Sequence, residues 1–319
     1  MQVDFPPVRN GIDYLVSVVE HLDADTHTGP REIKYAVLHL QAAAEVLLKS
    51  RLLREHWSLV FSDPARATSE KFNASDFNSC GTDAAVERLK NICGLGISKK
   101  DAAALKDLGK DRNALQHYGL THSAEAVESR AGAVLDFLLR FLDAELLPLL
   151  DAPERESIEE DMLRVRSGLN TIEAFVNERM NRLRGNELKG TTDSVLPCSV
   201  CGQWALAVIP KGAYCHFCVT TMSAEDLALA FQEFEPGHPA NECPQCHAST
   251  LACFAFMDGP GEEMHYCFTC QARYNLDELA NCGGCGCPWP HEGDDDGTAQ
   301  TLCGDCRRRI EDEELASRW

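Results

Sequence analysis

Six Cys-x-x-Cys pairs lie in the last third of the chain, and they constrain its fold more than any other feature. Two thiols three residues apart can hold one side of a tetrahedral zinc ion, and a second pair on a nearby loop completes four-thiolate coordination. Taken in order, the pairs predict three structural zinc sites, with 13, 20 and 17 residues between the inner cysteines of each. The expected ligands are Cys198, Cys201, Cys215 and Cys218 for the first site, Cys243, Cys246, Cys267 and Cys270 for the second, and Cys282, Cys285, Cys303 and Cys306 for the third.

The alternative use of sixteen cysteines is a secreted disulfide scaffold. The tight pairing, the polar start of the chain and the absence of a long apolar run favour a cytoplasmic zinc protein instead. Cys287 lies two residues after Cys285, so the third site has a spare thiol, and His216 and His247 are further possible replacements for a cysteine ligand. The other cysteines outside the pairs, Cys80, Cys93 and Cys253, are expected to be free thiols.

Charge is distributed unevenly along the chain. The net charge is −20, and residues 191–319, with 20 acidic and 6 basic side chains, contribute −14 of it. Each four-thiolate zinc site would add about −2 because four thiolates outweigh one dication. The cysteine-rich segment therefore opposes binding to a phosphate backbone, although its motifs resemble those of nucleic-acid readers.

Apolar spacings of three and four residues predict helices through the first half of the chain. They cover 32–54, 83–92, a helix that begins at the capping box Ser98–Asp101, and a long helix after Ser123. We therefore expect an all-α helical bundle followed by an array of small zinc-ribbon or zinc-knuckle modules. The expected domains are 1–153 for the bundle, 154–190 for a long connecting helix and 191–319 for three zinc modules.

Residues 157–184 carry a heptad-like apolar stripe that predicts one long helix. Two interpretations remain open: a helix packed along the bundle, or a coiled coil that forms a dimer or spaces the domains. Within the cysteine-rich segment, Ser223–Ala228 and Asn275–Ala280 follow the second pair of the first and second sites. Their similar sequences predict a repeated knuckle with a short capped helix.

The sequence contains no Gly-rich phosphate loop and no Gly-x-Ser-x-Gly motif. The remaining candidate for chemistry is Arg112-Asn-Ala-Leu-Gln-His117, which we expect between two helices. A second match, Arg51 to His56, is expected to close an amphipathic helix, where basic residues favour the helix dipole. The alternative for Arg112 and His117 is a structural role, in which they cap carbonyls and pair with an acid such as Asp111.

Arg112, Asn113 and His117, together with the acidic and basic helix around Glu45 and Lys49, give residues 10–150 a resemblance to the HEPN superfamily. The resemblance implies a metal-independent endoribonuclease in which His117 is general acid or base, Arg112 holds the phosphate and Asn113 orients one of them or binds phosphate oxygen.

The same resemblance implies a homodimer with RNA as substrate and a toxin or antiviral-defence setting. We expect Lys106 and Lys110 to contribute to an RNA-binding groove, and the acidic zinc module to regulate the enzyme or to bind a protein partner. The alternative function is a non-catalytic dimerisation adaptor whose zinc ribbons bind a protein partner.

Overall fold

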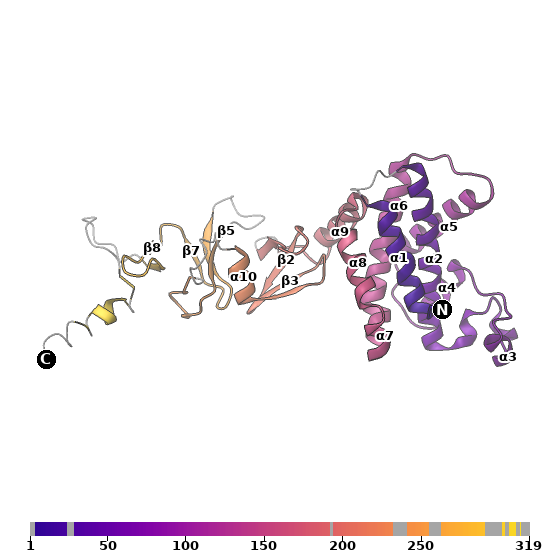
Figure 1. The fold of residues 1–319 in the computed structure, drawn as a ribbon, viewed down its shortest axis with the longest axis horizontal. Helices are drawn as coiled ribbons and strands as arrows, with labels where there is room; N and C mark the ends of the chain where they lie inside the picture. Colours follow the sequence, from indigo (N-terminus) through magenta and orange to yellow (C-terminus); the bar gives the residue numbers. More distant parts are fainter. Residues whose placement is uncertain are drawn as a thin grey trace. The chain divides into compact units, whose positions relative to one another are not determined.

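The computed structural model describes residues 4–23, 29–191, 194–231, 241–254, 263–290, 302–303, 306–310 and 313. The chain divides into two compact units, here called the helical unit (Met1–Asn181) and the cysteine-rich unit (Arg182–Trp319). Figure 1 shows helices in the first and small sheets in the second. The predicted helical first half and small cysteine-rich modules are therefore confirmed. None of the described helices is long and apolar enough to cross a bilayer.

The helical unit is built from helices joined by short turns. Its α-helices are α1 (Pro7–Leu22), α2 (Pro30–Glu55), α3 (Ser69–Asn73), α4 (Thr82–Asn91), α5 (Lys99–His117), α6 (Ala124–Phe141), α7 (Ala152–Glu156), α8 (Glu159–Leu169) and α9 (Glu173–Gly185), which crosses into the second unit. Shorter turns are the 3-10 segments η1 (Trp57–Val60), η2 (Pro64–Arg66) and η4 (Leu147–Leu149), and the π-helical turn η3 (Leu142–Leu146).

The core of the helical unit surrounds α2. This helix packs against α1, α4, α5 and α6, and Figure 1 shows α1 alongside it. Because α2 is covered on several sides, its buried side chains form one wide stripe, which covers about half of its circumference at about 100° per residue. A side chain at Gly11 of α1 would lie 2.6 Å from Leu47, so the absence of a Cβ permits this close approach of α1 to α2.

The prediction of one long helix over residues 157–184 is wrong in one respect. The structure has two helices there, α8 and α9. Hydrogen bonds of the 3-10 type connect Asn170 to Ser167 and Thr171 to Gly168 and end α8. The two halves pack on different helices: α8 lies against α1, and α9 crosses α6 at Gly132, where a Cβ would lie 2.7 Å from the Ala174 carbonyl oxygen. A single straight helix would not make both contacts.

The apolar stripe of residues 157–184 is almost entirely buried within the chain. Ile158, Met162, Val165, Leu169 and Ile172 are all less than 9% exposed. The stripe is therefore used to pack α8 and the first part of α9 along the bundle, which confirms the first of the two interpretations and leaves no stripe for a coiled coil.

The described part of the cysteine-rich unit forms three small antiparallel sheets. Their orders are β1-β2-β3-β4, β5-β6-β7 and β8-β9. The bounds are β1 (Val195–Pro197), β2 (Trp204–Ile209), β3 (Gly212–Cys215), β4 (Thr221–Ser223), α10 (Ala224–Phe231), β5 (Leu251–Phe254), β6 (Met264–Cys267), β7 (Arg273–Asn275), β8 (Leu279–Asn281) and β9 (Pro288–Pro290).

The predicted repeat of a knuckle with a capped helix holds for the first copy only. Ser223 Oγ accepts from the Asp226 N–H and starts α10. In the second copy, Asn275 and Glu278 exchange two local hydrogen bonds, but these close a turn between β7 and β8. The helix expected over Asn275–Ala280 is absent there because residues 279–281 pair with β9 instead.

Candidate functional site

The six Cys-x-x-Cys pairs form three clusters in the order that the sequence predicts. In each cluster the four sulfur atoms lie within 4.8 Å of one another. The clusters are Cys198, Cys201, Cys215 and Cys218; Cys243, Cys246, Cys267 and Cys270; and Cys282, Cys285, Cys303 and Cys306.

The sulfur separations fit zinc. Sulfur atoms of opposite pairs are 3.7 Å apart for Cys198 and Cys218, 3.6 Å for Cys246 and Cys267, and 3.7 Å for Cys285 and Cys303. Four sulfurs at the usual zinc–sulfur distance of about 2.3 Å form a tetrahedron whose edges are about 3.8 Å. Each cluster can thus hold one zinc ion with four protein ligands and no open position, which is the arrangement of a structural site.

A shared turn presents the sulfur atoms. In five of the six pairs, the residue after the second cysteine has a left-handed backbone, and its N–H donates to the carbonyl of the first cysteine at 2.7–2.9 Å. These residues are Gly202 (φ 72°), Val219 (φ 65°), His247 (φ 60°), Gln271 (φ 62°) and Gly286 (φ 77°). In the sixth pair, Arg307 donates to Cys303 at 3.0 Å, and residues 306–310 continue as a helix.

Neighbouring donors stabilise thiolates in the clusters. Burial opposes ionisation of Cys282, but N–H groups that include those of Cys303 and Gly284 lower its pKa to about 6. Burial also opposes ionisation of Cys267, while the Cys270 N–H and the Thr250 hydroxyl bring its pKa down to about 7. Thiolates are the form that binds zinc, so both effects favour an occupied site.

The alternative ligands considered from the sequence lie outside the clusters. Cys287 is not a member of the third set, although its carbonyl accepts from the Cys282 N–H at 2.9 Å. His247 occupies the left-handed position of a turn, and its Nδ1 lies 2.8 Å from Glu242. Four cysteines complete each described cluster without Cys287 or a histidine.

The sequence predicted that the Arg112 motif lies between two helices. In the structure the motif lies on helix α5. Helix α5 begins at the predicted cap, where Ser98 Oγ accepts from the Asp101 N–H at 3.1 Å. It continues to His117, because Asp111 and Ala114 remain buried against the bundle. Gly119 (φ 93°) then ends it by donating to the Ala114 carbonyl at 2.6 Å.

Arg112 and His117 are therefore five residues apart on one helix. At about 100° per residue, their side chains leave the axis in directions that differ by about 140°. Arg112 and Asn113 line a hollow of about 290 Å³ whose lining does not include His117. Within the described part of the chain, no side-chain hydrogen bond or ion pair holds His117, which is exposed.

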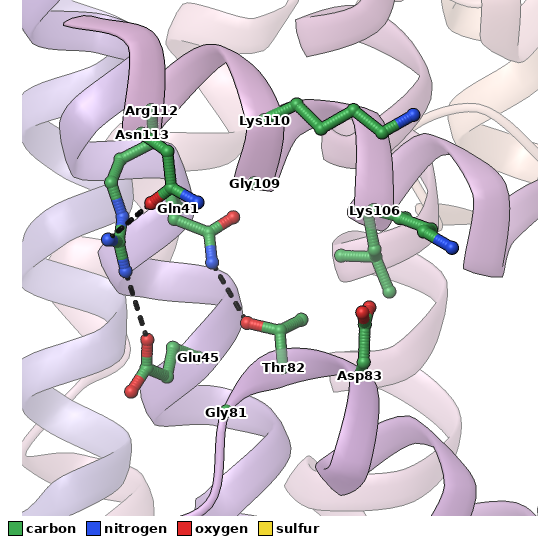
Figure 2. Close-up of a pocket in the computed structure, with 11 residues that line it drawn as sticks. Gln41, Glu45, Gly81, Thr82, Asp83, Lys106, Gly109, Lys110, Arg112 and Asn113 are labelled. Atoms are coloured by element: carbon green, nitrogen blue, oxygen red, sulfur yellow. Dashed lines mark hydrogen bonds and ion pairs between the residues drawn. The ribbon is translucent and has the colours of Figure 1, made fainter. Parts of the chain in front are cut away.

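The hollow beside Arg112 has cationic and acidic walls (Figure 2). Lys106 and Lys110 come from α5, and Glu45 and Asp83 come from α2 and α4. The other lining residues are Gln41, Gly81, Thr82, Leu105, Gly109 and Asn113. The site thus gathers the predicted RNA-binding lysines and Arg112 around one opening, with two carboxylates beside them.

Side chains of α2 and α5 hold the Arg112 guanidinium. It lies 3.8 Å from Glu45, and it donates to Asn113 Oδ1 at 2.8 Å and to Gln116 Oε1 at 3.2 Å. Glu45 is in turn 2.5 Å from Lys49. The Arg112 side chain is 30% exposed, so it is oriented and still accessible.

Asp111, Arg51 and His56 make contacts that stabilise the fold. Asp111 is buried and accepts from Arg130 of α6 at 2.6 Å. Arg51 pairs with Glu55 at 3.4 Å, and His56 caps the end of α2, with Nδ1 2.8 Å from Ser58 Oγ. The expectation that Arg51 and His56 close a helix is confirmed. The sequence suggested Asp111 as an acidic partner of Arg112 or His117. In the structure Asp111 pairs with Arg130 instead.

Comparison of the chain with protein-family models, with curated proteins and with solved structures finds no match. The two features of the chain that can carry a function are therefore its cysteine clusters and the hollow beside Arg112.

Proposed function

We propose that the helical unit is a metal-independent endoribonuclease of the HEPN type, and that the cysteine-rich unit is a zinc-binding module that regulates it or binds a protein partner. The observation that carries the proposal is the oriented but accessible Arg112, which shares a hollow with Lys106, Lys110 and Asn113. Cationic side chains with fixed directions are suited to a phosphodiester. A setting in toxin or antiviral defence belongs to the same proposal.

The proposed chemistry uses only side chains of this protein. A 2′-hydroxyl loses its proton to a His117 imidazole, and its oxygen attacks the adjacent phosphorus. The bond to the 5′-oxygen breaks, the leaving oxygen takes a proton from the imidazolium that His117 has become, and the products are a 2′,3′-cyclic phosphate and a 5′-hydroxyl. Arg112 stabilises the extra charge on the phosphorane oxygens, because charge-assisted donors bind the transition state more strongly than the ground state.

A second copy of the chain supplies the missing half of this site. Arg112 and His117 leave α5 in directions about 140° apart, so one chain does not aim both at the same phosphate. We infer that Arg112 of one copy acts with His117 of the other. Such a homodimer would bring two equivalent sites together by symmetry.

The test is RNA cleavage by the full-length protein in EDTA, which removes free divalent cations. We expect cleavage to 2′,3′-cyclic phosphate ends, and a loss of at least about a hundredfold in Arg112→Ala and in His117→Ala. His56→Ala serves as control, because this exposed histidine caps α2 and should leave the rate unchanged. A folded protein that cleaves no RNA, or equal rates in all variants, would reject the proposal.

The second candidate function is a non-catalytic adaptor. It is favoured by exposed apolar side chains of the cysteine-rich unit such as Val200, Ile209 and Leu229, which are 61%, 41% and 51% exposed within a segment of net charge −14. Exposed apolar groups on a charged module suit a basic protein partner. In that case Arg112 is a structural residue held by Glu45, and the cleavage assay gives no product.

A further inference from the structure

The hollow beside Arg112 contains a hydrogen-bond acceptor without a partner. Gln41 of α2 is only 4% exposed. Its amide nitrogen Nε2 donates to Thr82 Oγ1 at 2.8 Å, but its Oε1 has no hydrogen-bond partner among the described residues. Figure 2 shows the nitrogen directed at Thr82 and the oxygen directed towards Gly109. A buried acceptor without a partner is costly to the fold, so this oxygen is suited to a donor that enters the hollow.

Gly109 lies next to the same oxygen. It is in the interior of α5, where glycine destabilises a helix relative to alanine. Packing does not require this glycine, because the nearest atom to a Cβ there, apart from the backbone of the helix, would be Gln41 Oε1 at 4.0 Å. A side chain at this position would instead fill part of the hollow beside the oxygen. The glycine therefore leaves room for a ligand where the acceptor lacks a partner.

The helices around the hollow supply groups of opposite hydrogen-bonding character (Figure 2). Helix α5 supplies the ammonium groups of Lys106 and Lys110, whereas α2 and α4 supply Gln41 Oε1 and the Asp83 carboxylate. Lys110 also pairs with Asp107 at 2.7 Å, but its side chain is 66% exposed, so this ion pair is weak and a ligand can replace it. A matching ligand has N–H donors on one edge and acceptors on the next.

Guanine matches both sets of groups better than the other RNA bases. Its N1–H and 2-amino group are adjacent donors for Gln41 Oε1 and the Asp83 carboxylate, and its O6 and N7 are acceptors that lysine commonly contacts. Adenine and cytosine place a ring acceptor beside their amino group, and uracil has one donor between two carbonyls. The hollow of about 290 Å³ is near the lower limit of ligand sites, roughly 300–1,000 Å³, and so suits a single base.

We propose that this hollow binds one guanine base of the RNA, with Gln41 as the residue that determines specificity and Lys106 and Lys110 as donors to the base. Because Arg112 lines the same hollow, the phosphate that is cleaved lies next to that guanine. The inference rests on the proposed function in taking RNA as the ligand, but it concerns contacts to a base and is measured without cleavage.

The experiment is binding of the full-length, zinc-containing protein to fluorescent uridine decamers that carry guanine, adenine, cytosine or uracil at one central position. Their sugars are 2′-fluoro, so they lack the hydroxyl that attacks the phosphate. We expect the guanine decamer to bind at least about fivefold more tightly than the others, which is the effect of one net hydrogen bond. Gln41→Leu should abolish this preference. Gly109→Ala should reduce it and raise the unfolding temperature, because alanine favours the helix.

Ser50→Ala is the matched control. Ser50 is a similarly buried polar residue of α2, its hydroxyl donates to the Val46 carbonyl at 2.8 Å, and it does not line the hollow. We expect this variant to keep the guanine preference. Equal binding of the four decamers by the wild type, tighter binding of another base, or an unchanged preference in Gln41→Leu would overturn the inference.

The two proposals can fail separately. A wild type that cleaves ordinary RNA but shows no guanine preference would overturn the guanine site and leave the ribonuclease in place. A wild type that prefers the guanine decamer but cleaves no RNA would reject the ribonuclease and support the guanine site.

Discussion

A buried ion pair connects the late helices of the helical unit. Asp136 of α6 and Arg179 of α9 are only 2% and 3% exposed, and their side chains meet at 3.1 Å. Arg140 lies 3.1 Å from the same carboxylate and 2.8 Å from Asp101 of α5. Since a buried charge without its counter-charge is costly, this pair links α9 to the bundle in one arrangement.

We predict that Asp136→Ala lowers the free energy of unfolding of the helical unit by about 3–5 kcal/mol, because it removes the carboxylate of a buried ion pair that Arg179 and Arg140 both contact. Urea denaturation followed by circular dichroism measures the change. Lys100→Ala is the control: Lys100 is 74% exposed and pairs with Glu178, so its loss should cost less than about 1 kcal/mol. Equal effects of the two changes would contradict this assignment.

The three cysteine clusters, each presented by short turns, predict how many zinc ions the chain binds. The purified protein should contain three zinc ions per chain by elemental analysis, as the three clusters require. Cys201→Ser or Cys285→Ser should remove about one ion each, because a hydroxyl replaces a thiolate ligand. Cys287→Ser should retain all three, since Cys287 lies outside the described clusters. Loss of zinc in Cys287→Ser would place that thiol in the third site.

The grouping of the cysteines into three clusters could be predicted from the sequence. The break between α8 and α9 could not. Cys-x-x-Cys spacing fixes two sulfurs on one turn, so local chemistry determines the site. The break at Asn170 depends on α8 packing on α1 and α9 packing on α6, which is tertiary information. Gly168, Asn170 and Thr171 are weak helix formers, but propensity alone did not decide whether the helix would end there, because tertiary packing often overrides it.

The second copy of the repeat shows the same limit. Asn275–Ala280 has the polar and apolar pattern of a capped helix, and Asn275 and Glu278 do make a local hydrogen-bonded turn. Pairing of β8 with β9 then takes residues 279–281 into a sheet. The local sequence determines the turn from Asn275 to Glu278, whereas pairing with β9 determines the conformation of residues 279–281. For α5, a continuing buried face likewise placed Arg112 and His117 on the helix, where the sequence predicted a connection.

In the whole molecule, negative charge is concentrated in the C-terminal part of the chain. Residues 1–190 carry a net charge of −6 and include the cationic hollow of α5, whereas residues 191–319 carry −14 before zinc-bound thiolates are counted. Three four-thiolate zinc sites would add about −6. We therefore expect any phosphate backbone to contact the helical unit, and the cysteine-rich unit to repel RNA or to contact a cationic partner.

We propose above that Arg112 and His117 act from different copies of the chain. The direct test is to co-express Arg112→Ala and His117→Ala with different tags and to isolate the mixed dimer by both tags. One of its two sites then keeps an intact arginine and an intact histidine, so we expect RNA cleavage at about half the wild-type rate. Both homodimers should be inactive. A mixed dimer as inactive as its parents, beside an active wild type, would contradict the claim.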